Sequence, residues 1–203
     1  MKTLMLDWKK EIKKEELDEV IQLLENDGVI IFPTDTVYGI GCNCYSEKAI
    51  KRIFEIKNRS LDKPINVLTD SVDKIKSISN INQKEEKLVE KYMPGALTII
   101  VDKKEEVPDI LTSNLKTVGV RIPNDKIALE ILKAFPYPLA TTSANESGEE
   151  AGIELEDFKD LFDGKVDAII DGGKTKIQVA STIVRVEKDS LKILREGSIK
   201  IED

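Results

Sequence analysis

Apolar residues recur along the chain with two different spacings, and the alternation between the two predicts an α/β fold. Between residues 17 and 24 they recur every three or four positions, which predicts a helix with one buried face, and the Asn-Asp-Gly at 26–28 would end it. The apolar run at 29–32 then predicts a buried strand that ends before Pro33. A helix followed directly by a buried strand is the basic unit of this fold class.

The same two patterns continue to the end of the chain. Further helices are predicted from a capping Ser46 to about Lys57, and at 83–92, 127–135 and 155–162. Further strands are predicted at 65–68, 97–101, 118–122, 139–142, 166–170, 179–186 and 191–194. Because the last two strands are close enough to pair antiparallel, we expect a mixed sheet. No repeat or linker divides the chain, so a single domain is expected over residues 1–203.

The composition is that of a soluble protein with a substantial core. The chain has 203 residues, of which 40% are hydrophobic and 34% charged. No run of about 18 apolar residues occurs, so we expect no membrane span. The N-terminus has no secretory signal, because charged residues follow within ten positions, and a cytoplasmic location is therefore expected.

The absence of histidine restricts the chemistry that the chain can perform. It excludes Ser-His-Asp and Cys-His nucleophile systems and any imidazole base. Cys42 and Cys44 are too few for a disulfide framework or a zinc site, and we interpret them as small packed residues near a turn. Catalysis would then depend on positioning and on stabilisation of charge.

Basic residues are concentrated in one stretch of an otherwise acidic chain. With 31 basic and 38 acidic residues the net charge is −7. Residues 48–63 hold six basic against two acidic side chains, a local excess of +4, which leaves −11 elsewhere. A small anionic ligand suits such a patch. Its clearest part is Lys57-Asn58-Arg59 followed by Lys63, where three cations within seven residues could bind phosphate or could form an ordinary solvated loop.

Polar clusters follow several predicted strands. The Pro-Thr-Asp-Thr-Val-Tyr-Gly-Ile-Gly at 33–41 offers hydroxyls and amides that could bind a zwitterion or a phosphate, or could be a plain turn. The hydroxyl-rich run at 141–148 allows the same two interpretations. Arg121 stands in an apolar strand and needs an anionic partner, which is either a substrate carboxylate or an acidic residue of the fold. Ser181, within a predicted strand, and Arg195, just after the last one, are further polar residues of this kind. Each of these signals is weak alone.

Taken together and in order, these segments resemble the Sua5/YrdC/TsaC family of threonylcarbamoyl-AMP synthases. The resemblance covers about residues 15–200 and includes 33–41, 57–64, 94–98, 119–123, 142–148, 171–173, 181–184 and 195–197. It implies the YrdC-type fold, a twisted mixed sheet flanked by helices with an open concave substrate face. The chain is most similar to the short, single-domain TsaC-like form, without the C-terminal domain of the longer members.

The resemblance also implies an activity. L-threonine, bicarbonate or CO2, and ATP accompanied by Mg²⁺ would give threonylcarbamoyl-AMP and pyrophosphate, and a separate transferase would pass the threonylcarbamoyl group to adenosine 37 of tRNA. The implied L-threonine site is Thr36, Arg121, Thr141 and Ser181. The implied ATP site is Lys57, Arg59, Lys63, Thr117, Ser143, Asn145 and Arg195, with Lys57, Arg59 and Ser143 as its catalytic members. No fixed protein ligands for the metal are implied.

Two positions depart from the family pattern. Some members carry His where this chain has Leu68, and the leucine removes a possible contact with threonine. Some members carry Asn where this chain has Lys63, and the lysine preserves or strengthens phosphate binding. The alternative to a synthase is a YrdC- or YciO-like protein that binds double-stranded RNA or tRNA without synthase activity. The acidic balance outside residues 48–63 argues against wide contact with a duplex.

Overall fold

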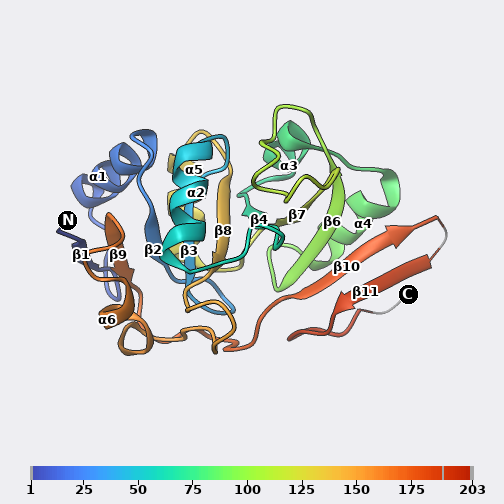
Figure 1. Ribbon diagram of the computed structural model, residues 1–203. Coiled ribbons are helices and arrows are strands. Elements are labelled where there is room, and N and C mark those ends of the chain that lie inside the picture. The colour runs from blue at the N-terminus through green and yellow to red at the C-terminus, as the bar shows by residue number, and fades with distance from the viewer. Residues whose placement is uncertain (1, 189, 202–203) are drawn as a thin grey trace.

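A long mixed β-sheet runs through the whole molecule (Figure 1). The computed structural model describes residues 2–188 and 190–201. Its strands are β1 (Leu4–Asp7), β2 (Ile30–Phe32), β3 (Gly39–Asn43), β4 (Asn66–Leu68), β5 (Ser79–Asn80), β6 (Leu97–Lys103), β7 (Thr117–Arg121), β8 (Leu139–Ser143), β9 (Ala168–Asp171), β10 (Thr182–Glu187) and β11 (Ser190–Arg195). They pair in the order β1-β9-β2-β3-β8-β4-β7-β6-β10-β11, with β5 beside β6.

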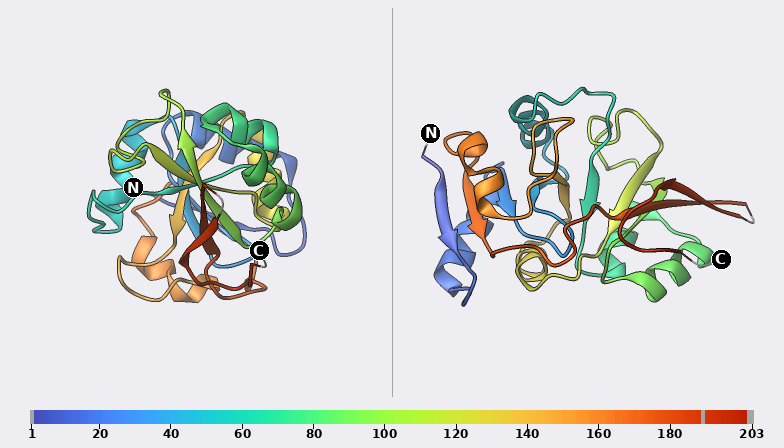
Figure 2. Two further views of the ribbon diagram at one scale, coloured as in Figure 1. Left: turned by 90° about the vertical axis from the view of Figure 1, so that its right-hand side faces the viewer. Right: turned by 90° about the horizontal axis from the view of Figure 1, so that it is seen from below.

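Both strand directions occur, so the predicted mixed sheet is confirmed. Parallel pairs are β1–β9, β9–β2, β4–β7 and β6–β10, and the other pairs are antiparallel. The last two strands form the expected antiparallel hairpin, which projects from the rest of the molecule (Figure 2). Strand β8 joins the half of the sheet containing β3 to the half containing β4.

Four of the described helices, those that begin at residues 47, 72, 83 and 126, follow a residue whose side chain caps them. The helices are α1 (Lys14–Glu25), α2 (Glu47–Ile56), α3 (Val72–Ile78), α4 (Gln83–Tyr92), α5 (Lys126–Ala134) and α6 (Lys159–Phe162), with a 3-10 turn at Leu155–Asp157. The predicted cap at Ser46 is present, since its hydroxyl accepts a hydrogen bond from the amide of Ala49. Asn82 and Glu85 cap α4 reciprocally, each side chain accepting from the other's backbone amide. None of the described helices is both long and apolar enough to cross a membrane.

Alternating side chains of the central strands divide the core into two layers. On β2, Ile31 belongs to the cluster that includes the buried face of α2, whereas Ile30 and Phe32 belong to the cluster formed with α1 and α5. The second cluster also contains Leu68 of β4 and Leu139 of β8. Period-two alternation therefore also fixes which polar residues of β4, β7 and β8 share the face of that second cluster.

The segment that follows β9 crosses the sheet to reach β10, along the lower side of the view in Figure 1. It covers residues 172–181, and we call it the strap. The amide of Ile177 donates to the carbonyl of Asp35, and that of Gln178 donates to the carbonyl of Thr36, both at 2.9 Å. The strap thus fixes the backbone of the segment between β2 and β3.

Some elements differ from the sequence prediction. Strands β1, β3 and β5 and helix α3 were not predicted, and the helix expected at 155–162 is a 3-10 turn followed by the four-residue α6. Strand β3 was interpreted only as a ligand loop or turn because Gly39 and Gly41 have low strand propensity. Both glycines are required by the packing of the neighbouring strand, as described next.

Candidate functional site

Eight of the polar and small residues around β8 share one face of the sheet. Cross-strand partners lie on the same face, and the register pairs Gly41 with Thr141, Thr141 with Asn66, and Leu68 with Arg121. Alternation along each strand then gives the complete set: Gly39, Gly41, Asn66, Thr117, Gly119, Arg121, Thr141 and Ser143. Four of these are predicted site residues, and they come from β7 and β8, which β4 separates in the sheet.

Glycines on this face leave room for the side chains of their neighbours. A Cβ on Gly41 would lie 2.9 Å from Oγ1 of Thr141, and one on Gly39 would lie 2.7 Å from its Cγ2. A Cβ on Gly119 would lie 2.1 Å from Oδ1 of Asn66. All three distances are too short for ordinary contact, so close approach to Thr141 and Asn66 requires glycine here.

Arg121 is an internal ion-pair partner in the ligand-free molecule. Its Nη2 forms a salt bridge with Oδ1 of Asp35, its Nη1 donates to Oγ1 of Thr36 at 2.9 Å, and its Nε donates to the carbonyl of Gly95 at 2.9 Å. The side chains of Arg121 and Asp35 are 7% and 3% exposed. Of the two partners left open by the sequence, the acidic residue of the fold is therefore present.

The guanidinium of Arg121 nevertheless has capacity left for a ligand. Three of its five N–H donors are engaged, and two remain for a carboxylate. Burial lowers the pKa of Arg121, and Asp35 opposes that shift, so the group remains cationic. Among the described residues no group donates to the second carboxylate oxygen of Asp35, Oδ2.

Ser181, at the end of the strap, and Arg195, at the end of β11, come together beside this site. Arg195 donates from Nε and Nη2 to the carbonyl of Ser181, at 3.1 and 2.8 Å, and the hydroxyls of Ser181 and Thr98 are 2.8 Å apart. The amide of Thr182 donates to the carbonyl of Ala96 at 3.0 Å, beside Gly95, whose carbonyl accepts from Arg121, and the charge of Arg195 further lowers the pKa of Arg121. The structure thus brings residues implied for the threonine site and for the ATP site together.

Lys57, at the end of α2, contacts the segment that follows β8. Its Nζ donates to the carbonyls of Ser143 and Asn145, at 2.5 and 2.6 Å, and to Oδ1 of Asn145 at 3.1 Å. The residue is only 1% exposed. Burial, and then the charge of Arg59, lower the pKa of Lys57 to about 7. The three oxygen acceptors favour its charged form.

Arg59 and Lys63 belong to the loop between α2 and β4. Arg59 is partly exposed and donates to the carbonyls of Lys63 and Pro64, at 3.1 and 2.9 Å, which leaves part of its guanidinium for a ligand. Lys63 is exposed, and its ammonium contacts no acceptor within the described part of the chain. Thr117 lies at the opposite end of β7 from Arg121, roughly 13 Å away along the strand.

Two residues next to the site residues were not among those predicted. Asp35 is the only acidic residue in the segment 33–41, and its position beside Thr36 was a usable signal for the partner of Arg121. Asn66 lies between Thr141 and Gly119 in the register, and no local pattern distinguished it from a surface residue at a strand start. The roles of individual site residues remain predictions.

The sequence of the chain matches the model of a known family. The Sua5/YciO/YrdC family model, described as "Telomere recombination", matches residues 22–197. The chain belongs to this family.

Members of the Sua5/YciO/YrdC family with similar sequences carry synthase names. A protein of Methanocaldococcus jannaschii named putative threonylcarbamoyl-AMP synthase is 36% identical over 196 residues, covering 95% of this chain and 92% of its own length. The threonylcarbamoyl-AMP synthase of Pyrococcus abyssi is 34% identical, covering 99% of this chain. The chain spans 59% of that longer relative.

Solved structures of the family have the same fold. Sua5 of P. abyssi complexed with L-threonine matches with a TM-score of 0.93 and 34% identity, over 96% of this chain and 58% of that one. YciO of E. coli matches with a TM-score of 0.85 and 26% identity, over 96% and 95% of the two chains. The predicted YrdC-type fold is therefore confirmed.

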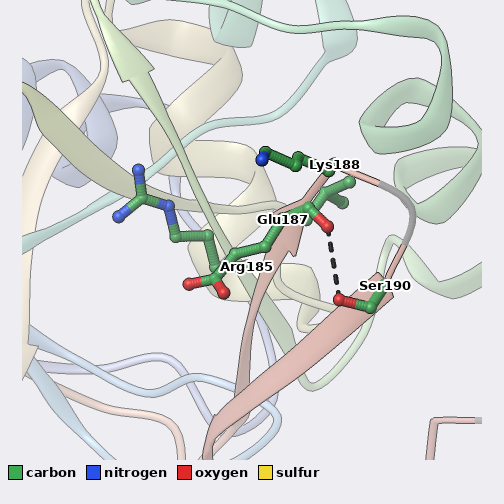
Figure 3. A pocket seen from close by; sticks show the side chains of 5 residues that line it. Arg185, Glu187, Lys188 and Ser190 are labelled. Atoms are coloured by element: carbon green, nitrogen blue, oxygen red, sulfur yellow. Dashed lines mark hydrogen bonds between the residues drawn. The ribbon is translucent and has the colours of Figure 1, made fainter.

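Other parts of the molecule contribute little to this site. A shallow hollow lies on the β10–β11 hairpin and is lined by Arg185, Val186, Glu187, Lys188 and Ser190 (Figure 3). The hydroxyl of Ser190 donates to the carbonyl of Glu187 at 3.2 Å. None of the five is a predicted site residue.

The two cysteines are buried in the core, in and just after β3, and burial raises the pKa of both thiols. Within the described residues no cluster of three or more His, Cys, Asp or Glu side chains could bind a metal.

Proposed function

We propose that the chain is an L-threonylcarbamoyladenylate synthase, a nucleotidyltransferase that uses L-threonine, bicarbonate or CO2, and ATP. The observation that carries the proposal is the convergence of two kinds of group on one sheet face. A buried arginine with two free donors lies beside Thr36, and hydroxyls with flanking cations lie at the adjacent strand ends. The P. abyssi relative solved with L-threonine supports this choice over other acid substrates.

The amino acid would bind at the Arg121 end of the site. Its carboxylate would accept from the two free N–H groups of Arg121, with the hydroxyls of Thr36 and Ser181 and the β8 residue Thr141 around it. A planar guanidinium suits a carboxylate better than a lysine would, because it can donate two parallel hydrogen bonds. Water would be excluded by the burial of Arg121 and its partners.

The triphosphate would lie toward Ser143 and the α2–β4 loop. Arg59, Lys63 and Arg195 would cover its negative charge, and the hydroxyl of Ser143 would orient it. The amine of threonine adds to the carbon of CO2 and loses a proton, giving a carbamate. A carbamate oxygen then attacks the α-phosphorus as the bond to pyrophosphate breaks. Such a transfer depends mainly on alignment of the reactants and on neutralisation of the phosphate charge. It needs no imidazole base, which agrees with a chain that has no histidine.

Magnesium would enter with ATP rather than bind to the protein first. The site offers hydroxyls, carbonyls, cations and the single carboxylate of Asp35, and the described residues contain no cluster of three or more possible metal ligands. Mg²⁺ commonly binds through substrate phosphates and keeps several waters, so this donor set fits a metal carried by the triphosphate. Bound there, the metal would neutralise phosphate charge. We further propose a cytoplasmic location and a separate transferase that delivers the threonylcarbamoyl group to adenosine 37 of tRNA.

The activity can be tested with purified protein, ATP, magnesium and radiolabelled bicarbonate. The synthase is expected to release pyrophosphate and form an acid-labile labelled adenylate only when L-threonine is present. Serine and D-threonine serve as matched controls for the amino acid. ATP turnover that does not depend on an amino acid would contradict the proposal. Salt-sensitive binding of double-stranded RNA without adenylate formation would favour the RNA-binding alternative.

A further inference from the structure

The ammonium of Lys57 has no donor left for a ligand. A lysine ammonium has three N–H donors, and Lys57 directs them at three oxygens: the carbonyls of Ser143 and Asn145, and Oδ1 of Asn145. All three acceptors lie at the last residue of β8 or just after it. The carbonyl of Lys57 also accepts from the amide of Ser147 at 3.3 Å. Both the main chain and the side chain of Lys57 therefore bind one loop.

Asn145 is saturated in the same network. Its Oδ1 accepts from Lys57 and, at 2.5 Å, from the hydroxyl of Ser143. Its Nδ2 donates to the carbonyls of Glu146 and Glu149, at 2.9 and 2.7 Å. An amide that makes two bonds through its oxygen and two through its nitrogen has filled its usual capacity. The network leaves the acceptor side of the Ser143 hydroxyl as the group that it presents.

The cations near Lys57, in contrast, keep N–H donors that a ligand can reach. Arg59 keeps donors beyond the two that contact the carbonyls of Lys63 and Pro64, and Lys63 is exposed. Lys57 is 1% exposed, so a phosphate could reach its ammonium only by displacing the 143–147 segment. The cost would be three charge-assisted hydrogen bonds, which are among the stronger ones in proteins.

We propose that Lys57 is a positioning residue, whose ammonium holds the loop after β8 in the shape that presents Ser143, and that it does not itself bind the triphosphate. The inference rests on the proposed function for the identity of the nucleotide, but not for the role of the loop. The rival assignment, carried by the family resemblance, has Lys57 gripping phosphate directly. The two roles differ in what removal of the ammonium does to the free protein.

The test compares Lys57→Met with Lys63→Met, which removes an exposed ammonium from the same loop. Amide hydrogen exchange of the ligand-free proteins is measured over residues 143–149. Lys57→Met is expected to speed exchange there by about tenfold or more, because local opening loses its restraint. Lys63→Met is expected to leave it unchanged. Equal exchange in wild type and Lys57→Met overturns the proposal whether or not the chain proves to be a synthase.

Ligand binding and turnover separate the roles further. By calorimetry, ATP is expected to bind Lys57→Met within about threefold of wild type and Lys63→Met about tenfold more weakly. The kcat of Lys57→Met is expected to fall by about 100-fold, with the KM for ATP little changed, because the loop no longer aligns Ser143. Equal loss of ATP affinity in both variants, with unchanged exchange, would establish direct phosphate binding by Lys57.

A measurement on the wild-type protein covers the case in which Lys57→Met does not fold. With lysine labelled at carbon and nitrogen, each ammonium gives its own magnetic resonance signal. Added pyrophosphate is expected to shift the side-chain signal of Lys63 and leave that of Lys57 in place. A pyrophosphate-dependent shift at Lys57 that equals or exceeds that of Lys63 contradicts the proposal.

Discussion

Arg121 on β7 and Asp35, in the segment after β2, form an ion pair although 86 positions separate them in the sequence. Strands β3, β8 and β4 lie between β2 and β7, so the pair joins the two halves of the sheet across β8. Both side chains are more than nine-tenths buried, and one oxygen of Asp35 lacks a hydrogen-bond donor in the described structure. The pair is therefore part of the fold as well as of the site.

Arg121→Met should affect stability and substrate use together. Removing one partner leaves the Asp35 carboxylate buried without its counter-ion, which costs about 3–5 kcal/mol. The KM for threonine should rise as well, because the carboxylate of the substrate loses the two parallel hydrogen bonds from the guanidinium. Urea unfolding and initial rates measure the two effects. Arg185→Met, at an exposed position on β10, should stay within about 0.5 kcal/mol of wild type. A purely kinetic effect of Arg121→Met would contradict the structural role.

Arg59→Met should raise the KM for ATP by about 10-fold or more, since a hydrogen bond to a charged group contributes about 1.5–3 kcal/mol. Stability should change little, because Arg59 is partly exposed and its present acceptors are neutral carbonyls. Steady-state kinetics in ATP give the result. Lys51→Met removes an exposed cation from α2 and serves as the matched control. Equal behaviour of the two variants would mean that the phosphates lie elsewhere.

The buried Lys57 should make stability depend on pH. Its folded pKa of about 7 lies below the ordinary value near 10.5, so above pH 7 the unfolded chain binds more protons than the folded one. The free energy of unfolding should therefore rise with pH between about 7 and 10, by roughly 1 kcal/mol per unit. Below pH 7 this contribution is constant.

Denaturation by urea at several pH values, in wild type and Lys57→Met, isolates the effect because other titrating groups cancel in the difference. The charged groups near Lys57 are Arg59 and, through Asn58, Glu146. Glu146→Gln is the control for the carboxylate. Parallel curves for wild type and Lys57→Met would disprove a lowered lysine pKa.

Gly119→Ala should destabilise the sheet through Asn66. The added methyl would lie 2.1 Å from Oδ1 of Asn66, so the side chain must move, and overpacking of this kind costs about 1–3 kcal/mol. Thermal unfolding measures the loss. Combining Gly119→Ala with Asn66→Ala should recover part of it, because the obstructing amide is gone. Additive losses in the double variant would show that Asn66 is not the obstacle.

Cys42 and Cys44 should be inert in the folded protein. Both are fully buried, and burial raises their pKa values, so little thiolate is present or reachable at neutral pH. A thiol reagent should therefore label neither residue until urea unfolds the chain, and then both. Rapid labelling of the native protein would contradict the packing.

The sequence was most informative where packing is local. The strand predicted at 139–142 is β8 at 139–143, and the Ser46 cap begins α2, because period and capping depend on residues a few positions apart. Strand β3 was missed because the reason for its glycines, the side chain of Thr141, lies about 100 positions away. The partner of Arg121 was left open for the same reason. Register between distant strands is decided by the whole sheet, which no local pattern contains.

The route of the strap determines when the site can form during synthesis. Residues 172–181 bind the backbone of Asp35 and Thr36 and end at Ser181, and β10 and β11 follow with Arg195, which donates to the carbonyl of Ser181. A ribosome-bound nascent chain that ends near β9 already contains Arg121, Thr141 and Ser143 but lacks the residues that close the threonine end. The proposed threonine end of the site is thus completed only by residues that are translated after β9, so a nascent chain that stops there should not retain L-threonine.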